Sequence, residues 1–444
     1  MPSKTLLESN LQQKPQTWHP CTQMKEQEHH QPFRVKKAKG AYIELENGHK
    51  MIDAISSWWC KSLGHNDPRI KAALLEQLDD FEHVILANTT SRKIEQLTAK
   101  LSQLCPSLDK VFYAGDGACA IEVALKMSLL SRKIKGETHR IQFISLQDSY
   151  HGDTSGAMSV SDCGLFTAPY AELMFDCEYI QNIPYVSGKH DPLWHDCETV
   201  WTKIEAQLEP FKHTANAVIF EPIVQGAGGM KIYSQDFLKR LAQWCKQNNV
   251  YLIADEIMTG IGRTGKMLAC HHADITPDFI CLSKGLTSGW LPLSVVLTHD
   301  KMYQLFYDDY ESGKSFLHSH TYSGNALAVS VALKTLKIME QDQICNYVTH
   351  TLQPYLLSSL QQVANETGKL TNIRGIGGIV AAEMIMADDT KRYAPLITEK
   401  AGELGALLRP IGNTLYWLPP LNIELQTIDR LKAITIEALL YISK

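Results

Sequence analysis

Short apolar runs alternate with helical segments between about residue 110 and residue 299, and this alternation constrains the fold more than any other feature of the chain. The apolar residues within each run are nearly continuous, as in parallel strands that are buried on both faces. We therefore predict an α/β protein with a large, mostly parallel sheet that has helices on both faces. Six runs are expected to be strands of this sheet: 111–116, 141–146, 217–222, 250–256, 279–283 and 293–299.

The two ends of the chain do not follow this central pattern. Near the start, two short apolar runs flank Asn47 and Gly48, a pair that favours the tight turn of a β-hairpin. After about residue 333 come a long helical region, a glycine-marked strand in RGIGGIVAAEMI, the segment LLRPIGNTLYWLPP and a final helix. We predict a large domain over residues 57–333 and a smaller α+β domain built from residues 1–56 and 334–444.

Composition excludes several classes of protein. The 444 residues are 20% charged and 44% hydrophobic, with a formal net charge of -5, which is typical of an ordinary globular chain. Basic blocks for nucleic acid or a membrane surface are not found, and neither is the apolar run of a membrane span. The start MPSKTLLESNLQQKPQTW lacks the apolar core of a signal peptide, so we expect a cytoplasmic protein. The eleven cysteines are scattered without a Cys-x-x-Cys pair, which favours reduced thiols over a metal site.

The segment GIGRTG (260–265) matches the glycine spacing of dinucleotide-binding turns. Gly260 to Lys266 also resembles the start of a phosphate-binding P-loop, but Met267 stands where a P-loop has Ser or Thr. The following MLACHHAD is a poor amphipathic helix, so the glycines do not open the helix that a dinucleotide site needs. We favour a glycine-rich turn that holds Arg263 and keep nucleotide binding as the weaker alternative.

Asp255 and Lys284 each follow a predicted strand of the central sheet. Ligands of open parallel sheets bind at the carboxyl ends of the strands, so these two side chains are expected to face one crevice. A lysine in a partly desolvated site loses its charge and becomes a nucleophile toward aldehydes, as pyridoxal phosphate requires. The alternative is that Asp255 caps a turn and Lys284 lies in solvent.

Three further features favour the pyridoxal phosphate interpretation. The turn at Gly117 and Ala118 follows a strand and opens a helix, where backbone amides can hold a phosphate. Tyr150 also follows a strand and is placed to stack on a flat ring, or else packs at a domain boundary. Thr321, in HSHTYSGN, offers a hydroxyl to a phosphate, although a plain polar loop has the same sequence pattern.

The segments AVIFEPIVQGAGGM, LIADEIMTGIGRTG, LSKGLTSG and HTYSGN, in this order, resemble the signature of class III pyridoxal-phosphate aminotransferases. The resemblance covers roughly residues 17 to 440. It implies fold type I, pyridoxal 5′-phosphate as the cofactor, and a homodimer with its active sites at the subunit interface. From the charge, hydropathy and cysteine spacing given above, we expect no metal, no nucleic acid and no membrane partner.

By this resemblance, Lys284 is the lysine that bonds to the cofactor and moves the substrate proton, and Asp255 pairs with the pyridine nitrogen. Tyr150 stacks on the cofactor ring and contacts substrate, with Ile257 against the opposite face. The resemblance assigns the phosphate to Gly117 and Ala118 and, from the partner subunit, to His320 and Thr321. Ala118 stands where the family commonly has serine.

The resemblance also implies a set of substrate contacts. Trp58 lines the acceptor pocket, Arg409 holds a substrate carboxylate, and Ser319 and Tyr416 lie beside it. A guanidinium binds a carboxylate through two parallel hydrogen bonds, although a surface arginine is the alternative. Cys21, in WHPCT, occupies the place of a substrate-contacting tyrosine in the family. Arg263 and Glu221 are expected to be structural.

Within the family, WHPCTQM, ISSWWC, SYHGDTSGAMSV and LLRPIGNTLYWLPP are most similar to the branch that aminates 8-amino-7-oxononanoate in biotin biosynthesis, with adenosylmethionine as donor. The loop HSHTYSGN resembles relatives that use lysine as donor. Two competing hypotheses are a class III enzyme that acts on an ω-amine and a cofactor-bound protein without catalysis.

Overall fold

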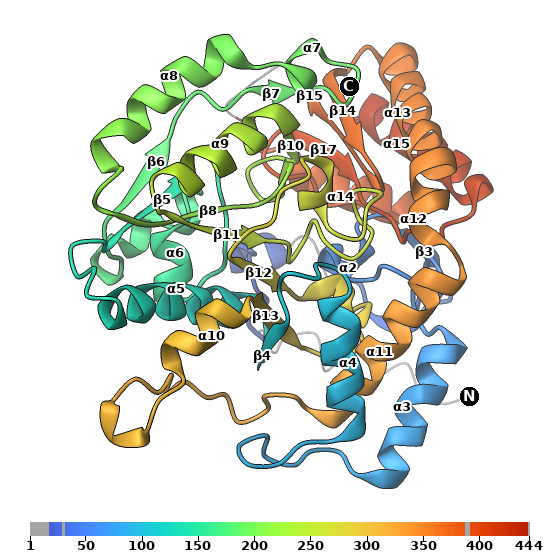
Figure 1. Cartoon of the computed structure of the whole chain (residues 1–444). Helices are drawn as coiled ribbons and strands as arrows, with labels where there is room; N and C mark the ends of the chain where they lie inside the picture. Colours follow the sequence, from blue (N-terminus) through green and yellow to red (C-terminus); the bar gives the residue numbers. More distant parts are fainter. Residues whose placement is uncertain (1–16, 29–31, 387–390, 443–444) are drawn as a thin grey trace.

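The computed structural model of the chain describes residues 17–28, 32–386 and 391–442 (Figure 1). Most of the polar start on which the absence of a signal peptide was argued, residues 1–16, lies outside the described residues. The centre of the molecule is a seven-stranded sheet, and all six predicted strands belong to it. The strands, in spatial order, are β4 (Lys110–Ala114), β13 (Ser294–Thr298), β12 (Phe279–Leu282), β11 (Tyr251–Asp255), β8 (Ala215–Phe220), β5 (Gln142–Leu146) and β6 (Cys177–Ile180).

The sheet is mostly parallel, as predicted. β13 runs antiparallel to both of its neighbours, whereas the other neighbouring strands are parallel. The edge strand β6 was not predicted, because its sequence CEYI is short and most of its residues are partly or fully exposed. These features confirm an α/β fold.

Alternate residues of the strands point to opposite faces of the sheet. Ala217 and Ile219 of β8 pack in one apolar cluster with helix α5 (Gly117–Ile134). Val218 and Phe220 of the same strand belong to the cluster that contains helix α9 (Gln235–Gln247). In Figure 1, α5 lies on one side of the sheet, and α9 lies on the other side with α8 (Glu198–Leu208). This burial of both faces explains the continuous apolar runs.

Three smaller sheets flank the central one. The first has the order β1-β2-β3-β16, formed by Val35–Lys39, Tyr42–Leu45, Lys50–Asp53 and Ala406–Leu407. The second has the order β7-β10-β9, formed by Tyr185–Val186, Lys231–Tyr233 and Val224–Gln225, and the third contains β14 (Leu370–Ile376), β15 (Ile379–Met384) and β17 (Thr414–Trp417). The predicted hairpin at Asn47 and Gly48 is present as β2 and β3. β16 lies parallel to β3, so the two ends of the chain share a sheet. The domain boundaries at residues 56 and 333 stay a prediction.

The glycine-marked segment RGIGGIVAAEMI forms a hairpin and not the single strand that we predicted. β14 and β15 run antiparallel, and Gly377 lies in the turn between them with a φ of +57°. A Cβ at this position would lie 2.3 Å from the backbone carbon of Thr264, so this close approach requires glycine. The turn places the hairpin directly against the GIGRTG segment.

The remaining helices pack around these sheets. Ser234 caps α9 by accepting hydrogen bonds from the amides of Asp236 and Phe237. Within the described residues, no helix has both the length and the apolar character that a membrane crossing demands. The α-helices that complete the fold are α3 (Pro68–Asp80), α4 (Arg92–Ser102), α6 (Ser155–Ser159), α7 (Pro192–His195), α10 (Asp300–Phe306), α11 (Ala326–Gln341), α12 (Ile344–Tyr347), α13 (Gln353–Thr367), α14 (Ala394–Leu404) and α15 (Leu425–Tyr441).

Candidate active site

A cavity of about 640 Å³ opens at the carboxyl ends of the central strands. It is reached by segments that follow β4, β5, β11 and β12, as expected for a ligand site in an open α/β sheet. Six of the residues predicted from the sequence line it: Gly117, Ala118, Tyr150, Asp255, Ile257 and Lys284.

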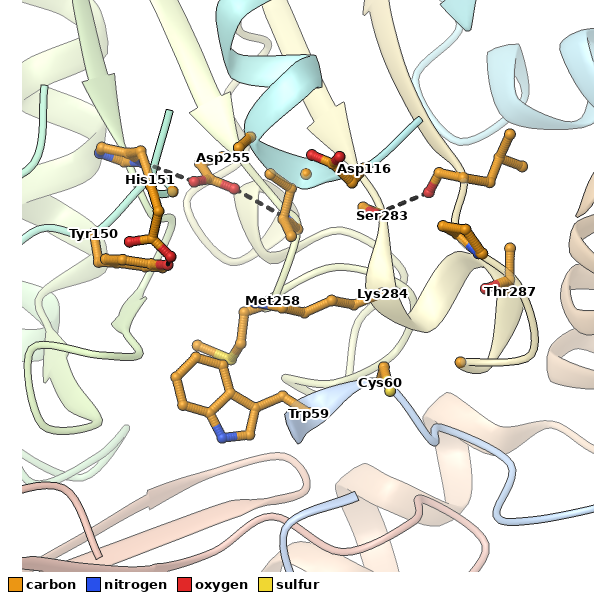
Figure 2. A pocket seen from close by; sticks show the side chains of 18 of the residues that line it. Trp59, Cys60, Asp116, Tyr150, His151, Asp255, Met258, Ser283, Lys284 and Thr287 are labelled. Atoms are coloured by element: carbon orange, nitrogen blue, oxygen red, sulfur yellow. Dashed lines mark hydrogen bonds and ion pairs between the residues drawn. The ribbon is translucent and has the colours of Figure 1, made fainter. Parts of the chain in front are cut away.

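Lys284 follows β12 and begins the short helix η6 (Lys284–Thr287). Figure 2 shows its side chain extended toward Met258, with the Trp59 ring below its end. The Nζ atom lies 4.8 Å from the centroid of the Trp59 ring. Burial lowers the pKa of the Lys284 amine, and the carboxyl groups of Asp255 and Glu221 oppose this effect. A lowered pKa increases the fraction of neutral amine, the form that attacks a carbonyl carbon.

Asp255 is the last residue of β11 and is 4% exposed. Its Oδ1 accepts a hydrogen bond from the amide of Ile257 at 3.1 Å, and its Oδ2 accepts one from Nδ1 of His151 at 2.7 Å. His151 is itself buried, and its Nε2 lies 3.4 Å from Oγ of Ser145. Asp255 is therefore held in one orientation by donors on both oxygens.

The N-terminus of α5 forms another wall of the cavity. Asp116 caps this helix by accepting a hydrogen bond from the amide of Cys119 at 3.0 Å. A Cβ added to Gly117 would lie 3.0 Å from Cγ2 of Ile257, and one added to Gly152 would lie 2.6 Å from Cβ of Ala118. The positive end of an 18-residue helix thus meets the cavity at a closely packed turn, which suits a bound phosphate.

Tyr150 is fixed at both its backbone and its hydroxyl. Its amide donates a hydrogen bond to Oε2 of Glu221 at 3.1 Å, and its hydroxyl donates one to Oδ2 of Asp153 at 2.9 Å. Oε1 of Glu221 accepts a further hydrogen bond from the amide of Gly226 at 2.8 Å. Burial raises the pKa of the Glu221 carboxyl to about 7. Glu221 was expected to be structural, and the structure places it in the cavity wall as the anchor of Tyr150.

Two adjacent tryptophans have different surroundings. Trp58 is 43% exposed and stacks under Arg409, whose Cζ lies 4.7 Å from the ring centroid. Trp59 lines the cavity, and its Nε1 donates a hydrogen bond to the hydroxyl of Tyr416 at 3.0 Å. The sequence assigned the pocket wall to Trp58 alone, whereas the structure puts Trp59 beside Lys284.

Arg409 and Cys21 lie in contact, although they are 388 positions apart in the sequence. Nη2 of Arg409 donates a hydrogen bond to the backbone carbonyl of Cys21 at 2.9 Å. The contact uses the Cys21 backbone and leaves the other guanidinium N–H groups of Arg409 available for a carboxylate. The substrate roles of both residues stay predictions.

The tryptophans belong to α2 (Ser56–Trp59), a turn of left-handed backbone. The φ angles of its residues are +50°, +45°, +70° and +72°. None of these residues is glycine, and left-handed helical backbone costs L-residues roughly 1–2 kcal/mol each. No periodicity in the sequence signals this turn.

Ser319, His320 and Thr321 do not line the cavity of their own chain. Nε2 of His320 lies 3.0 Å from Nε2 of His318, and the backbone carbonyl of Thr321 lies 2.8 Å from Nε2 of His83. The expectation that His320 and Thr321 act in the partner subunit stays a prediction.

The GIGRTG segment forms buried turns beside the β14–β15 hairpin. Arg263 is buried and donates hydrogen bonds to the backbone carbonyls of Pro419 at 2.7 Å and Gly378 at 3.2 Å. Between residues 260 and 268 no helix begins, so the amides are not arranged as in a dinucleotide site. In the part of the chain that the structure describes, no group of three potential metal ligands is found.

Comparison with known proteins extends these observations. Residues 23–439 match the family model described as Aminotransferase class-III. The adenosylmethionine-8-amino-7-oxononanoate aminotransferase of Helicobacter pylori is 39% identical, over 95% of both chains. The crystal structure of the enzyme of that name from Methanocaldococcus jannaschii is 32% identical, with a TM-score of 0.90 over the full length of both chains.

A second solved structure resembles the chain almost as closely. It is an amine transaminase from an uncultivated Pseudomonas species, in a form with bound pyridoxal phosphate. It is 27% identical, with a TM-score of 0.89 over 97% of this chain and all of the other. The family match and these relatives show a fold type I structure and pyridoxal 5′-phosphate as the family cofactor. The chain therefore belongs to the class III aminotransferases.

Proposed function

We propose that this aminotransferase transfers the amino group of S-adenosylmethionine to 8-amino-7-oxononanoate and so forms 7,8-diaminononanoate in biotin biosynthesis. The observation that carries the aminotransferase chemistry is the buried Lys284 amine in a cavity that also exposes the Asp255 carboxylate and the N-terminus of α5. The choice of substrates is supported by relatives of that name that are 31–39% identical to the chain. We expect a ping-pong scheme, because both substrates use one site.

The residues of the cavity fit pyridoxal phosphate. We assign the phosphate to the amides at Gly117 and Ala118, the ring nitrogen to the Asp255 carboxylate, and the ring faces to Tyr150 and Ile257. Gly117 fits this assignment, because a side chain there would contact Ile257 too closely and reduce the space for the phosphate. When bound, the cofactor supplies an electron sink for the substrate carbanion.

Lys284 has two tasks in this proposal. Its amine bonds to the cofactor in the resting enzyme, which requires the neutral form that burial favours. Once a substrate amine has displaced it, the same amine would be free to take up the proton of the substrate α-carbon. Trp59 limits where the amine can lie, since its ring is 4.8 Å from Nζ.

We assign substrate recognition to the edge of the cavity near Trp58 and Arg409. A keto-acid acceptor carries a carboxylate, which the Arg409 guanidinium would bind through two parallel N–H groups. Trp58, Trp59 and Tyr416 would provide apolar walls for an aliphatic chain. Cys21 is shorter than the tyrosine of the family and leaves more room at this edge.

We also propose that the active form is a homodimer, with His320, Thr321 and Ser319 completing the cavity of the partner subunit. The surface near this loop supports the proposal. Leu317 is 78% exposed and Tyr322 is 65% exposed, so two large apolar side chains of this segment are available for a partner surface to cover.

A half-reaction experiment tests the substrate assignment. The protein loaded with pyridoxal phosphate is mixed with adenosylmethionine, lysine or an ω-amine separately, and the visible absorbance of the bound cofactor is followed. Conversion by adenosylmethionine, with recovery on adding 8-amino-7-oxononanoate, is the expected result. If lysine alone converts the cofactor, the proposed acceptor stands and lysine replaces adenosylmethionine as the proposed donor.

The same experiment tests a second candidate function. The resemblance to the amine transaminase favours simple amines as donors. If an ω-amine converts the cofactor and neither adenosylmethionine nor lysine does, the biotin assignment is wrong and the amine transaminase activity replaces it.

A further inference from the structure

The left-handed turn α2 (Ser56–Trp59) is closed by its own backbone hydrogen bonds. The amide of Trp59 donates to the carbonyl of Ile55, and the amide of Cys60 donates to the carbonyl of Ser56, both at 2.9 Å. These bonds do not offset the poor contacts that a Cβ makes in left-handed backbone. The turn therefore needs support from outside its own residues.

That support comes from Asp53, the last residue of β3. Its side chain is fully buried. Oδ1 accepts a hydrogen bond from the amide of Ser57 at 2.8 Å, and Oδ2 accepts one from the Ser57 hydroxyl at 2.7 Å. Nε2 of His65 donates a further hydrogen bond to Oδ2 at 2.7 Å. The carboxylate thus holds the first part of the turn through the two donors of Ser57, and the third donor, His65, holds the carboxylate.

His65 is anchored independently of the turn. Its amide and carbonyl form a pair of backbone hydrogen bonds with Gly40, at 2.7 and 2.9 Å. The carboxylate of Asp53 therefore lies between a fixed donor and the strained residue Ser57. The side chain of Ser56, on the other side, donates to the carbonyl of Leu418 at 2.7 Å.

The turn decides where two aromatic side chains point. Trp59 is directed to Lys284 and Tyr416, and Trp58 is directed to Arg409. Arg409 reaches Trp58 because β16 lies parallel to β3, with Leu407 opposite Asp53. Relaxation of the turn to ordinary backbone would rotate both rings away from these partners.

We propose that Asp53, oriented by His65, is a positioning residue that holds the left-handed turn and thereby sets the Trp58–Arg409 and Trp59–Lys284 contacts for the acceptor substrate. Asp53 does not line the cavity and acts through the turn alone. The inference rests on the proposed function only for the identity of the acceptor.

The first test measures the turn directly, by hydrogen exchange of the cofactor-loaded enzyme. Asp53→Asn keeps the size of the side chain but leaves one oxygen where two accepted hydrogen bonds. We expect amides in residues 55–61 to exchange at least about ten-fold faster in this variant. Leu360→Ala, a core variant in α13, is the matched control and leaves exchange at these residues unchanged.

The second test separates positioning from stability. At temperatures where both variants are folded, D53N is expected to raise KM for the acceptor about ten-fold. It is expected to slow the donor half-reaction by a smaller factor, because only the Trp59–Lys284 contact takes part in that half. L360A, with a comparable loss of Tm, leaves KM unchanged. In a Ser57→Gly background the effect of D53N on KM is expected to shrink, because glycine adopts left-handed backbone without a Cβ penalty.

Two outcomes would overturn the inference: unchanged exchange at residues 55–61 in D53N, or equal KM values for D53N and L360A. If D53N does not fold, His65→Leu, which removes the fixed donor, takes its place with the same expected directions. Hydrogen exchange needs no substrate, so a wrong assignment of donor or acceptor does not affect the first test.

Discussion

Nδ1 of His151 donates a hydrogen bond of 2.7 Å to Oδ2 of Asp255 at the end of β11. The donor comes from the segment after β5 and the acceptor from β11, which are separated in the sheet by β8. The sheet thus brings a buried histidine to the acid that we assign to the cofactor ring nitrogen. The pair gives the first prediction.

Replacing His151 by glutamine or leucine tests its effect on Asp255. Loss of a hydrogen bond to a buried charged group costs about 1.5–3 kcal/mol. We therefore expect His151→Leu to lower kcat about 10- to 100-fold. His151→Gln, whose amide can still donate, should lose less. The measurement is kcat together with the visible spectrum of the bound cofactor, and equal activity of the two variants would contradict the prediction.

The raised pKa of Glu221 leads us to expect that the stability of the folded protein depends on pH. Its carboxyl has a pKa of about 7 in the folded protein, above the value of 4.5 for a free glutamate. The folded state therefore holds this proton more tightly, and the resulting stabilisation is complete below pH 4.5 and is lost as the pH rises to 7. The Glu221→Gln variant lacks this titration.

The Tm of wild type minus that of E221Q should thus fall between pH 5 and 7 and stay constant above it. Over the whole pH range, this effect changes the free energy of unfolding by an amount on the order of 3 kcal/mol. Thermal unfolding of the two cofactor-loaded proteins at matched ionic strength gives this difference. A difference that is constant across the range would show that Glu221 is ionised throughout.

Arg409 is predicted to affect one half of the reaction. Removing a guanidinium that binds a carboxylate costs about 2–3 kcal/mol, so Arg409→Ala should raise KM for the keto-acid acceptor about 30- to 100-fold. The cofactor spectrum should not change, since Arg409 lies outside the cavity that holds Lys284. Arg409→Lys keeps the charge without the planar fork and should recover only part of the affinity. Steady-state kinetics with varied acceptor measure this effect.

Gly117 is predicted to be required for cofactor affinity. A Cβ at this position would lie 3.0 Å from Cγ2 of Ile257 and would displace that side chain toward the cavity. Gly117→Ala should weaken binding of pyridoxal phosphate about ten-fold, a loss of about 1.4 kcal/mol. Ile257→Val, which removes one methyl group near the clash, should restore part of the affinity in the double variant. Equilibrium dialysis of the cofactor measures both changes.

The central sheet and the cofactor cavity follow from patterns that sequence displays. Asp255 ends β11 and Lys284 follows the neighbouring parallel strand β12, and the carboxyl ends of such strands meet at one edge, so their proximity was predictable. The hydrogen bond between His151 and Asp255 was not, because it depends on the lateral order of β5, β8 and β11, which no local pattern encodes.

The directions in which Trp58 and Trp59 point could not be predicted either, for a different reason. Adjacent side chains point apart in any regular backbone, and the left-handed turn decides which of the two enters the cavity. Its φ angles are imposed by Asp53 through Ser57 and not by the intrinsic preference of the residues. Tertiary contacts therefore fixed a local conformation that propensity alone would not select.

The pairing of β3 with β16 has a consequence for how the enzyme is made. Asp53 leaves the ribosome long before Leu407, its neighbour across the sheet. The central sheet has all of its strands once residue 298 has emerged, so it can form while the C-terminal part is still being translated. The contact between Trp58 and Arg409 forms only after residue 409 has emerged, so this edge of the proposed acceptor site is completed later than the central sheet that ends in Asp255.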